Sequence, residues 1–478
     1  METLVIENGT ILTQNPSRDV IERGTVVVDD GTITRVEAGP SANIDRQVDR
    51  RVDAEDHVVI PGLIDTHVHV SDVLLRGAGN EGRGLYDWLF NVKQPGMAKM
   101  SPSDHELAAE LYCVEALSAG ITTIVENDAE IPIEDVESIE RKLDIYEELG
   151  IRSAYARGIR DLPADEEFRS LIKKFTAKEP DVGHPPQERY TAATDEWIEH
   201  VESLHDTHHG RGNRQEIWIA PVIVEGMTTE GLRAAVEFAE RHDVMTTTHV
   251  SEAPEQESGP LSSVEYLNNI GYLGEHTLLG HCVQVSNKDV RLLAKTDTAV
   301  AHNIPSNMKL ASGFAPVPSM RRAGVTIGLG TDNSVLSDSV NLLADMRLIA
   351  LAHKGHSLDP GVLSAQAVLD MATIEGASAM GRSAELGSIE EGKRADLVCI
   401  DMDAPQLTPA TDIVSAVVYQ TLGSEVDLVV CEGEVVYEDG SVSGLRTDPH
   451  DLYEQVRTAA TALRRRSGLP TRTDVSSL

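Results

Sequence analysis

Two histidines stand one residue apart at the end of an apolar stretch, in the segment Pro61-Gly-Leu-Ile-Asp-Thr-His-Val-His69. Side chains alternate along a strand, so His67 and His69 point the same way if this segment ends a β-strand. Two imidazoles placed in this way can bind one metal ion, although His-x-His pairs also occur by chance on protein surfaces. The pair therefore indicates half of a metal site.

Three more polar clusters follow short apolar runs further along the chain. They are Thr248-His249-Val-Ser-Glu252, Leu279-Gly-His281-Cys and Gly328-Leu-Gly-Thr-Asp332. Four clusters of this kind, each at the end of a predicted strand, are hard to obtain by chance. We therefore expect a fold that brings the ends of its strands together.

The middle of the chain alternates short runs rich in Val and Ile with longer segments of helical periodicity. This alternation is typical of parallel strands joined by crossover helices, and it predicts an α/β fold with a (β/α)8 TIM-type barrel. The eight strands are expected at Leu63–His67, Thr122–Glu126, Arg152–Arg157, Ile217–Val224, Val244–Val250, Thr277–His281, Thr298–His302 and Val325–Thr331.

Helices are expected between these strands. The first, Ser103–Ala119, is predicted to begin with Ser103 as its N-cap and Glu106 as the partner in a capping box. A final helix is expected over Leu452–Arg466, followed by a polar tail. The other predicted helices are Glu134–Leu149, Thr229–Arg241, Ser286–Lys295 and Leu363–Met380.

Both chain ends show the short alternating runs of β-hairpins, with Asn8-Gly9, Asp30-Gly31 and Asp439-Gly440 as turn signals. We expect these two ends to pair into one small β-sandwich domain. The predicted domains are residues 1–60 for the first part of the sandwich, 61–387 for the barrel, 388–445 for the second part of the sandwich and 446–478 for a C-terminal helix and tail.

A (β/α)8 barrel gathers the C-terminal ends of all its strands on one face. His67, His69, His249 and Asp332 would then supply three nitrogens and one oxygen to a metal and leave a position open for water, as catalytic sites require. The metal lowers the pKa of that water towards ~7, which gives a hydroxide nucleophile at neutral pH.

Two further residues are candidates for catalysis. Glu252 lies three residues after His249, near enough to take a proton from the metal-bound water and deliver it to a ring nitrogen or leaving group. His281 could hydrogen-bond the hydroxide or orient the substrate. The plainer interpretations are a solvated loop residue for Glu252 and a core histidine for His281.

The formal net charge is −37, with 41 basic and 78 acidic residues, and the acidic residues are spread along the chain. Such a surface repels nucleic acid and anionic membranes. No apolar segment approaches the ~20 residues of a membrane helix, and no basic-then-apolar signal follows Met1, so a cytoplasmic location is expected. Arginine outnumbers lysine, which together with the dispersed acidic residues indicates adaptation to high salt.

Other metal and nucleophile candidates carry less weight. The four cysteines have no Cys-x-x-Cys spacing, and Cys282 is expected to be a small core residue rather than a nucleophile. His205, His208 and His209 cluster within 161–216, a segment longer than one helix requires, and a solvated surface is the expected reading of that cluster.

The set of predicted ligands, together with His249-Val-Ser-Glu252, resembles the amidohydrolase superfamily over nearly the whole chain. Leu85-Tyr-Asp-Trp-Leu-Phe-Asn91 and Asp338-Ser-Val-Asn341 resemble the s-triazine hydrolases, the group of atrazine chlorohydrolase and melamine deaminase. His302-Asn-Ile-Pro-Ser-Asn-Met-Lys-Leu-Ala-Ser-Gly313 is similar to the methylthioadenosine/S-adenosylhomocysteine deaminases. Members of both groups hydrolyse a substituent from a nitrogen-rich aromatic ring.

The resemblance implies candidate substrate contacts at Trp88, Asn333 and Asn303, with Trp88 placed to stack on a flat ring or to pack its own loop. Leu336 fits neither the hydroxyl nor the thiol that the triazine enzymes carry at that position. Where the nucleoside deaminases have a ribose-binding Glu after a Pro, this chain has Pro95-Gly96-Met97, and their fourth-strand His is missing from Ala220-Pro-Val-Ile-Val-Glu225.

The expected function is a mononuclear metal-dependent aminohydrolase that removes an amino group from a nitrogen heteroaromatic ring. The alternatives are dechlorination of an s-triazine-like ring, deamination of a 5′-modified adenosine and a non-catalytic scaffold. The fourth predicted strand, Ile217–Val224, has no lysine to bridge two ions, so one divalent ion is expected, with Zn²⁺ favoured and Fe²⁺ as the alternative. A homodimer or higher homo-oligomer is expected from the resemblance.

The charge suggests a first test. If the acidic surface reflects a saline habitat, the stability of the protein should rise with salt concentration, because screening relieves repulsion within a net charge of −37. The melting temperature should therefore be higher in molar salt than in low salt. An unchanged melting temperature would contradict this expectation.

Overall fold

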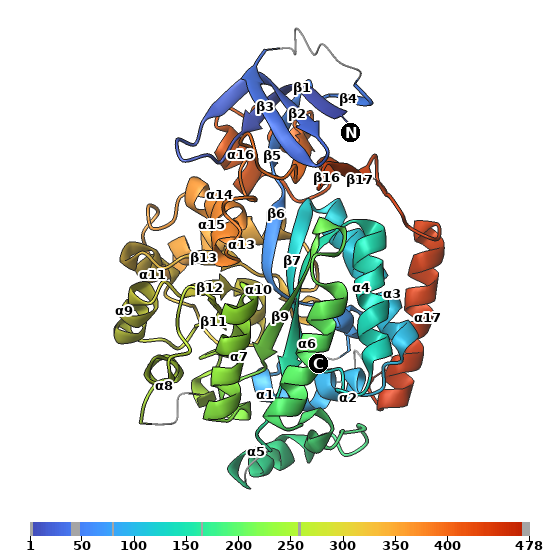
Figure 1. Ribbon diagram of the computed structural model, residues 1–478, viewed down its shortest axis with the longest axis vertical. Coiled ribbons are helices and arrows are strands. Elements are labelled where there is room, and N and C mark those ends of the chain that lie inside the picture. The colour runs from blue at the N-terminus through green and yellow to red at the C-terminus, as the bar shows by residue number, and fades with distance from the viewer. Residues whose placement is uncertain (1–2, 40–47, 79–80, 164–165, 257–259, 471–478) are drawn as a thin grey trace.

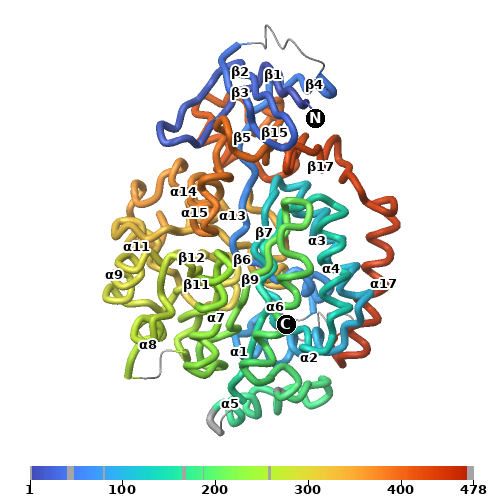
Figure 2. The backbone as a smooth tube through the Cα atoms, in the orientation of Figure 1, coloured from blue at the N-terminus to red at the C-terminus, as the bar shows by residue number. Residues whose placement is uncertain are grey.

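The computed structural model describes residues 3–39, 48–78, 81–163, 166–256 and 260–470. They form two β-sheets, one of them closed and surrounded by helices (Figure 1). The small domain lies at one end of the molecule, and the strands of the larger domain run away from it. The N-terminal strands lie beside elements from the C-terminal part of the chain (Figure 2).

The larger sheet is a parallel barrel in which each strand pairs with the next, and β13 returns to pair with β6. This confirms the predicted (β/α)8 fold. The strands are β6 (Leu63–His69), β7 (Ile121–Asp128), β8 (Arg152–Ile159), β9 (Gln215–Pro221), β10 (Thr246–Val250), β11 (Thr277–His281), β12 (Ala299–His302), β13 (Ile327–Leu329) and the short β14 (Asp332–Asn333).

Helices follow the strands around the outside of the barrel. Their apolar faces bury one continuous core with the strands, as amphipathic crossover helices do. The main helices are α3 (Pro102–Ser118), α4 (Val136–Leu149), α6 (Thr194–His208), α7 (Thr229–His242), α8 (Ser263–Ile270), α9 (Asn287–Lys295), α11 (Val317–Ala323), α13 (Leu342–Ser357), α14 (Ala365–Ala372) and α15 (Ile374–Ala379).

The second sheet joins the two ends of the chain. Its central pair is β5 with β15, which run antiparallel, so the N-terminal and C-terminal strands form one continuous sheet that curls around its own apolar core. Ile33 N–H donates to Lys393 O at 2.8 Å and helps to close the curl. The strands are β1 (Thr3–Leu12), β2 (Val20–Asp29), β3 (Thr32–Ala38), β4 (Arg50–Asp53), β5 (His57–Pro61), β15 (Leu397–Asp401), β16 (Val426–Cys431), β17 (Glu434–Glu438) and β18 (Ser441–Val442).

A buried ion pair ties the small domain to the N-terminal end of the barrel. The Arg152 guanidinium, at the start of β8, donates to both carboxylate oxygens of Asp396 at 2.9 and 3.0 Å and to Glu432 at 2.6 Å. All three side chains are buried. The last helix, α17 (Pro449–Ser467), packs along the side of the barrel against α3, and Arg466 pairs there with Asp104 at 2.6 Å (Figure 1).

Three element predictions were wrong in detail. The first barrel helix has Ser101, not Ser103, as its N-cap, with Asp104 completing the capping box, because Pro102 is favoured at the first helical position. Glu106 instead pairs with Arg141 at 2.7 Å. Leu363–Met380 is two helices, broken at Thr373.

The eighth predicted strand, Val325–Thr331, is also interrupted: β13 ends at Leu329, and the chain re-pairs with β6 only at Asp332. The domain boundaries predicted from the sequence stay a prediction.

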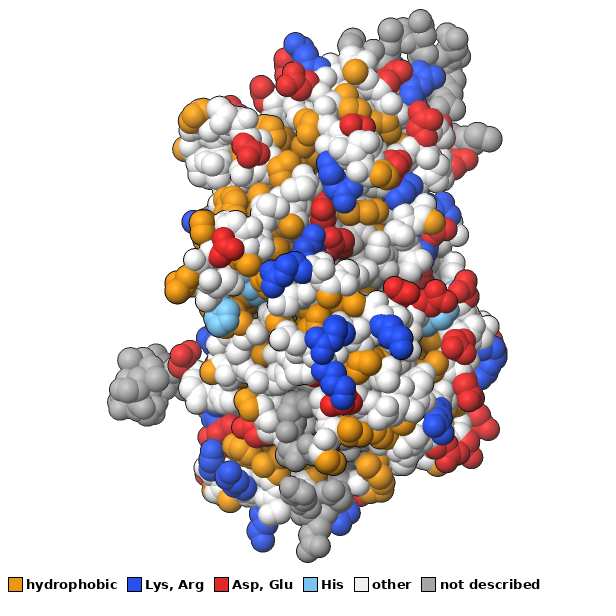
Figure 3. Space-filling view, turned by 90° about the vertical axis from the view of Figure 1, so that its left-hand side faces the viewer, with side chains coloured by type: hydrophobic (Ala, Val, Ile, Leu, Met, Phe, Trp, Pro, Cys, Tyr) orange, Lys and Arg blue, Asp and Glu red, His pale blue; other side chains and the backbone are white. Residues whose placement is uncertain are grey.

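None of the helices in the described ranges is both long and apolar enough to cross a membrane. On the face shown in Figure 3, acidic side chains are scattered among basic ones rather than gathered into a single patch.

The buried ion pair of Arg152 should contribute strongly to the stability of the fold. Arg152→Ala should lower the free energy of unfolding by about 3–5 kcal/mol, because it leaves the Asp396 carboxylate buried without its partner. Urea unfolding measures this change. Arg457→Ala is the matched control, since Arg457 and Glu454 form an exposed pair on α17 that should contribute little. Equal effects of the two substitutions would contradict the assignment of the buried pair.

Candidate active site

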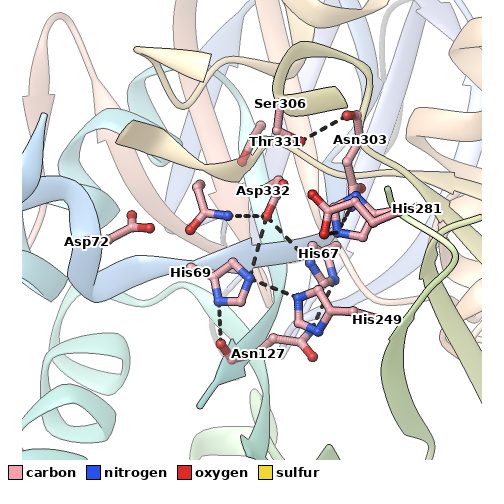
Figure 4. A network of polar contacts seen from close by, with 12 residues as sticks. His67, His69, Asp72, Asn127, His249, His281, Asn303, Ser306, Thr331 and Asp332 are labelled. Atoms are coloured by element: carbon pink, nitrogen blue, oxygen red, sulfur yellow. Dashed lines mark hydrogen bonds and ion pairs between the residues drawn. The ribbon is translucent and has the colours of Figure 1, made fainter. Parts of the chain in front are cut away.

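Three imidazoles converge at the C-terminal end of the barrel (Figure 4). His67 and His69 come from the end of β6, where alternation of side chains points both rings inward, and His249 comes from β10 across the barrel. His69 Nε2 and His249 Nε2 are 3.2 Å apart, and all three side chains are buried. The ring nitrogens of these three residues lie within 4.8 Å of one another, as one metal ion requires.

Backbone carbonyls set the tautomers of two of these rings. His69 Nδ1–H donates to Asn127 O at 2.7 Å, and His249 Nδ1–H donates to Val222 O at 2.6 Å. Each hydrogen bond leaves the Nε2 lone pair free and directed at the shared centre. Two unprotonated nitrogens 3.2 Å apart repel each other, and a cation between them would relieve this repulsion.

The third ring, His67, contacts the same loop. His67 Nδ1 lies 3.1 Å from the Asn127 side-chain amide, while His67 Nε2 and Asn127 Oδ1 are both buried without a hydrogen-bond partner. Turning the Asn127 amide by 180° places Oδ1 where Nδ2 stands, so that it accepts from His67 Nδ1–H. The orphaned Nε2 then becomes a third metal-ligand nitrogen.

A carboxylate completes the ligand group. Asp332 Oδ1 lies 3.5 Å from both His67 Nε2 and His69 Nε2 and accepts from Asn333 Nδ2 at 2.7 Å (Figure 4). Burial opposes ionisation of Asp332, but the neighbouring imidazoles of His67 and His281 hold its pKa well below the usual range. Burial lowers the pKa of all three imidazoles, so they are neutral and able to ligate.

The backbone is strained and crowded around this group. Asp332, His281, Cys282 and Ser251 all have positive φ, between +48° and +70°, which is uncommon for residues other than glycine and typical of functional sites. A Cβ on Gly330 would lie 2.8 Å from His67 Cβ, so only glycine lets the eighth strand pass this close to His67.

Glu252 and His281 lie beside the ligand group. His281 ends β11, and its Nε2 is 3.7 Å from Glu252 Oε2. His281 Nδ1–H donates to Asn307 Oδ1 at 3.0 Å. His281 also forms a second possible metal-binding group with His67 and Asp332, so the ligand geometry by itself permits His281 either as a ligand or as a catalytic residue.

A cavity opens from this group, and its wall contains several of the predicted residues. Trp88 and Asn333 line the cavity. Asn303 is not on the cavity wall, and its side-chain amide instead contacts the His281 ring. The complete lining is His69, Leu85, Tyr86, Trp88, Leu89, Lys93, Gln94, Ala129, Glu130, Arg160, Phe168, Val222, Ile223, His249, Glu252, Gln256, His281 and Asn333.

Two functional features were missed in the sequence. Asn127 contacts both His67 and His69, and its signal was the polar run Glu126-Asn127-Asp128 at the end of a strand. Lys93, which is buried, and Arg160, which is partly buried, are cations on the cavity wall, and no spacing in the sequence marked either of them. The aromatic pair Tyr86 and Phe168 comes from segments that are far apart in the chain.

The other candidates lie elsewhere. His205 and His209 stack on each other at 4.2 Å between ring centroids, at the C-terminal end of α6, and His208 is buried nearby. Among the described residues, the groups that could hold a metal are both in the barrel site. Cys282 is buried in the core, and none of the four cysteines forms a disulfide.

Residues 58–436 match the amidohydrolase family. The chain belongs to this family. The resemblance inferred from the sequence motifs, and the enzyme class that it implies, are therefore confirmed, and a divalent metal fits the ligand group.

Individual relatives span almost the whole chain. A 5-methylthioadenosine/S-adenosylhomocysteine deaminase from Symbiobacterium thermophilum is 34% identical over 92% of this chain and 94% of its own length. An S-triazine hydrolase from Gordonia rubripertincta is 32% identical over 98% of both chains. The crystal structure of atrazine chlorohydrolase from Arthrobacter aurescens, complexed with zinc, has a TM-score of 0.85 and 26% identity over 96% of this chain and all of that one.

The ligand group makes a direct prediction. His249→Ala should remove most of the bound metal. Substitution of a residue that only hydrogen-bonds a ligand lowers metal affinity by about 10- to 100-fold, and loss of a ligand itself should lower it further. Metal content after purification measures this, and His67→Ala and Asp332→Ala should behave alike.

His276→Ala is the control for the metal measurement, because this histidine precedes β11 and contacts Val244 O outside the site. It should retain its metal. Near-normal metal in His249→Ala would mean that His249 is not a ligand.

Proposed function

We propose that the protein is a mononuclear zinc-dependent aminohydrolase that replaces the amino group of a nitrogen heteroaromatic ring by oxygen, with release of ammonia. The observation that carries this proposal is the position of Glu252. Its buried carboxylate lies on the cavity wall beside the His/Asp group, where a general base must stand. Relatives named as deaminases cover more than nine-tenths of the chain and support the reaction class.

His67, His69, His249 and Asp332 would hold the ion, which when bound lowers the pKa of a coordinated water towards ~7 and so supplies hydroxide at neutral pH. Ferrous iron is the alternative ion for the same ligands. The fourth barrel strand, β9, contains no lysine, which supports one ion rather than a bridged pair.

Glu252 moves the proton in this mechanism. Burial raises the pKa of Glu252, with His281 and Lys93 opposing the shift, and a carboxylate with a raised pKa is a stronger base. It takes a proton from the attacking water and passes it to the ring nitrogen beside the attacked carbon. It then moves the second proton, from the hydroxyl now on that carbon, to the amino group, so that the C–N bond breaks, ammonia leaves and the carbon becomes a carbonyl. Gln256 Oε1 accepts from the backbone N–H of Glu252 at 2.7 Å and so fixes the loop.

His281 positions the attack. Because its Nδ1–H is held by Asn307, its Nε2 faces Glu252 and the ligand group. From there it hydrogen-bonds the attacking water and keeps it aligned with the Glu252 carboxylate. Trp88, buried on the cavity wall, offers a flat face to a heteroaromatic ring, and Asn333 lies between Asp332 and Lys93 on the same wall.

Two other reactions use the same residues. Hydrolytic dechlorination is favoured by the structural similarity to atrazine chlorohydrolase, and it differs chemically because chloride leaves without a proton. Deamination of a 5′-modified adenosine is favoured by the relatives named for it. It is disfavoured by Gly96, which has no ribose-binding carboxylate and packs so tightly against Leu75 that an added Cβ would approach it to 2.6 Å.

The oligomeric state, the location and the habitat of the protein are also part of this proposal. We infer a homo-oligomer, a cytoplasmic location and a saline habitat from the family resemblance and the acidic composition.

The role of Glu252 makes the sharpest test of the reaction. Glu252→Gln should lower kcat by roughly 10²–10⁴, the usual contribution of general acid–base catalysis, because the amide cannot accept the proton. Metal content and fold should be unchanged, since glutamine is close in shape and Glu252 is not placed as a ligand.

Glu255→Gln is the matched control, because Glu255 is exposed three residues further along the same loop. Loss of metal along with activity in Glu252→Gln would show that Glu252 is a ligand. A fully metallated and active Gln variant would rule out the mechanism.

The substrate for this test comes from a screen. Aminopurines, aminopyrimidines and aminotriazines are assayed for ammonia, and their chlorinated counterparts for chloride. Ammonia release from an amino-substituted ring supports the proposal. Chloride release without ammonia release would establish the dechlorination instead.

A further inference from the structure

A buried cation lies on the wall of the cavity. The side chain of Lys93, from the helical segment after β6, is 4% exposed, and its Nζ lies 5.5 Å from the centre of the Trp88 ring. Lys93 Nζ donates to Asn333 Oδ1 at 2.9 Å, and Asn333 in turn donates to the predicted ligand Asp332. Lys93 therefore stands one side chain away from the metal-ligand group.

This ammonium is incompletely compensated by the described residues around it. Of its three N–H groups, one reaches an acceptor at hydrogen-bond distance, and the nearest carboxylate oxygen, from Glu130, is 3.7 Å away. Burial raises the pKa of the neighbouring Asp72 to about 8, so that carboxyl is mostly protonated at neutral pH and supplies little negative charge. A buried cation with one distant counter-charge is costly unless a ligand completes its shell.

A second cation lines the same cavity. Arg160 is partly buried on the cavity wall, and the carboxylate of Glu130 acts electrostatically on it as well as on Lys93. Glu130 thus lies near both Lys93 and Arg160. The other acidic group on the wall, Glu252, is committed to proton transfer in the proposed reaction.

We propose that Lys93 binds an anionic oxygen on the substrate ring, and that the natural substrate is therefore an amino-substituted heteroaromatic ring with a carboxylate or an ionised ring hydroxyl. The ring would lie against Trp88 with its amino-bearing carbon towards Glu252. This inference rests on the proposed function for the amino group, whereas the anion site rests on Lys93 alone. The neutral triazines and nucleosides of the relatives' names lack such a charge.

Binding of unreactive ring pairs tests the anion site without turnover. Nicotinate and nicotinamide share one ring and differ in charge, and barbiturate and uracil form a similar pair for an ionised ring oxygen. Calorimetry on the metal-loaded enzyme should show tighter binding of one or both anions than of their neutral partners. Lys93→Met should remove that preference, an about 10- to 100-fold loss for a charge-assisted hydrogen bond, with less than threefold change for the neutral rings.

Two further variants make the result specific. Lys93→Gln keeps a donor for Asn333 Oδ1 but carries no charge, so it should also lose the anion preference while keeping its metal and its fold. Lys178→Met is the matched control, because Lys178 pairs with Asp87 in the neighbouring segment and is about half exposed. It should bind all four rings as the unaltered enzyme does.

The outcomes separate the anion site from the reaction. Equal binding of charged and neutral rings by the unaltered enzyme, or an anion preference that survives in Lys93→Gln, would overturn the inference. With a substrate from the ammonia screen, Lys93→Gln should raise KM for charged rings more than for neutral rings. A kcat loss shared by neutral rings would place Lys93 in the chemical step instead. Anion binding without any ammonia release would refute the proposed function alone.

Discussion

The site depends on two hydrogen bonds that involve no side chain other than the ligands themselves. Asn127 O and Val222 O accept the Nδ1–H groups of His69 and His249, and these bonds force both Nε2 lone pairs towards one point. Without them, either ring could rotate or change tautomer and lose its place as a ligand. Asn127 lies within β7 and Val222 directly follows β9, so the hydrogen bonding of the barrel sets the geometry of the candidate ligands.

The carbonyl of Asn127 is itself held by a buried charge network. Asn127 stands between Glu126 and Asp128, and the Lys142 ammonium from α4 pairs with both of these carboxylates. Lys142 is fully buried, so the pairs are not screened by water or salt. The network fixes the end of β7 from the side of α4. The outer helices of the barrel therefore contribute to the orientation of the candidate metal ligands.

The candidate ligand residues could be predicted from the sequence because they lie at the ends of predicted strands. His67, His69, His249 and Asp332 each follow an apolar run, and the barrel topology requires that such positions meet. The first and last residues of the helices and strands were harder to predict, because several local sequence signals competed. Two serines near Pro102 were both plausible N-caps, and the proline decided between them.

Apart from Trp88, which the motif resemblance singled out, the cavity-lining side chains on the long connections could not be predicted. The cover of the cavity is built by the segment after β6 and the segment after β8, where Tyr86 contacts Phe168 and Arg83 pairs with Glu179. These contacts join residues that share no periodic pattern, and they depend on how two irregular loops pack. Lys93 lies on the segment after β6, and no pattern in the sequence predicted that its charge would face the cavity.

The contrast between the exterior and the cavity follows from how salt acts on each. A net charge of −37 repels an anion, but the repulsion extends only over the Debye length, about 10 Å in 0.1 M salt and about 3 Å in 1 M salt. Lys93 is buried, so salt screens its interactions much less than those of the exposed groups. In concentrated salt, an acidic exterior therefore slows the approach of an anionic ring very little, while the attraction inside the cavity persists. An acidic surface and a cationic cavity are compatible in the same protein for this reason.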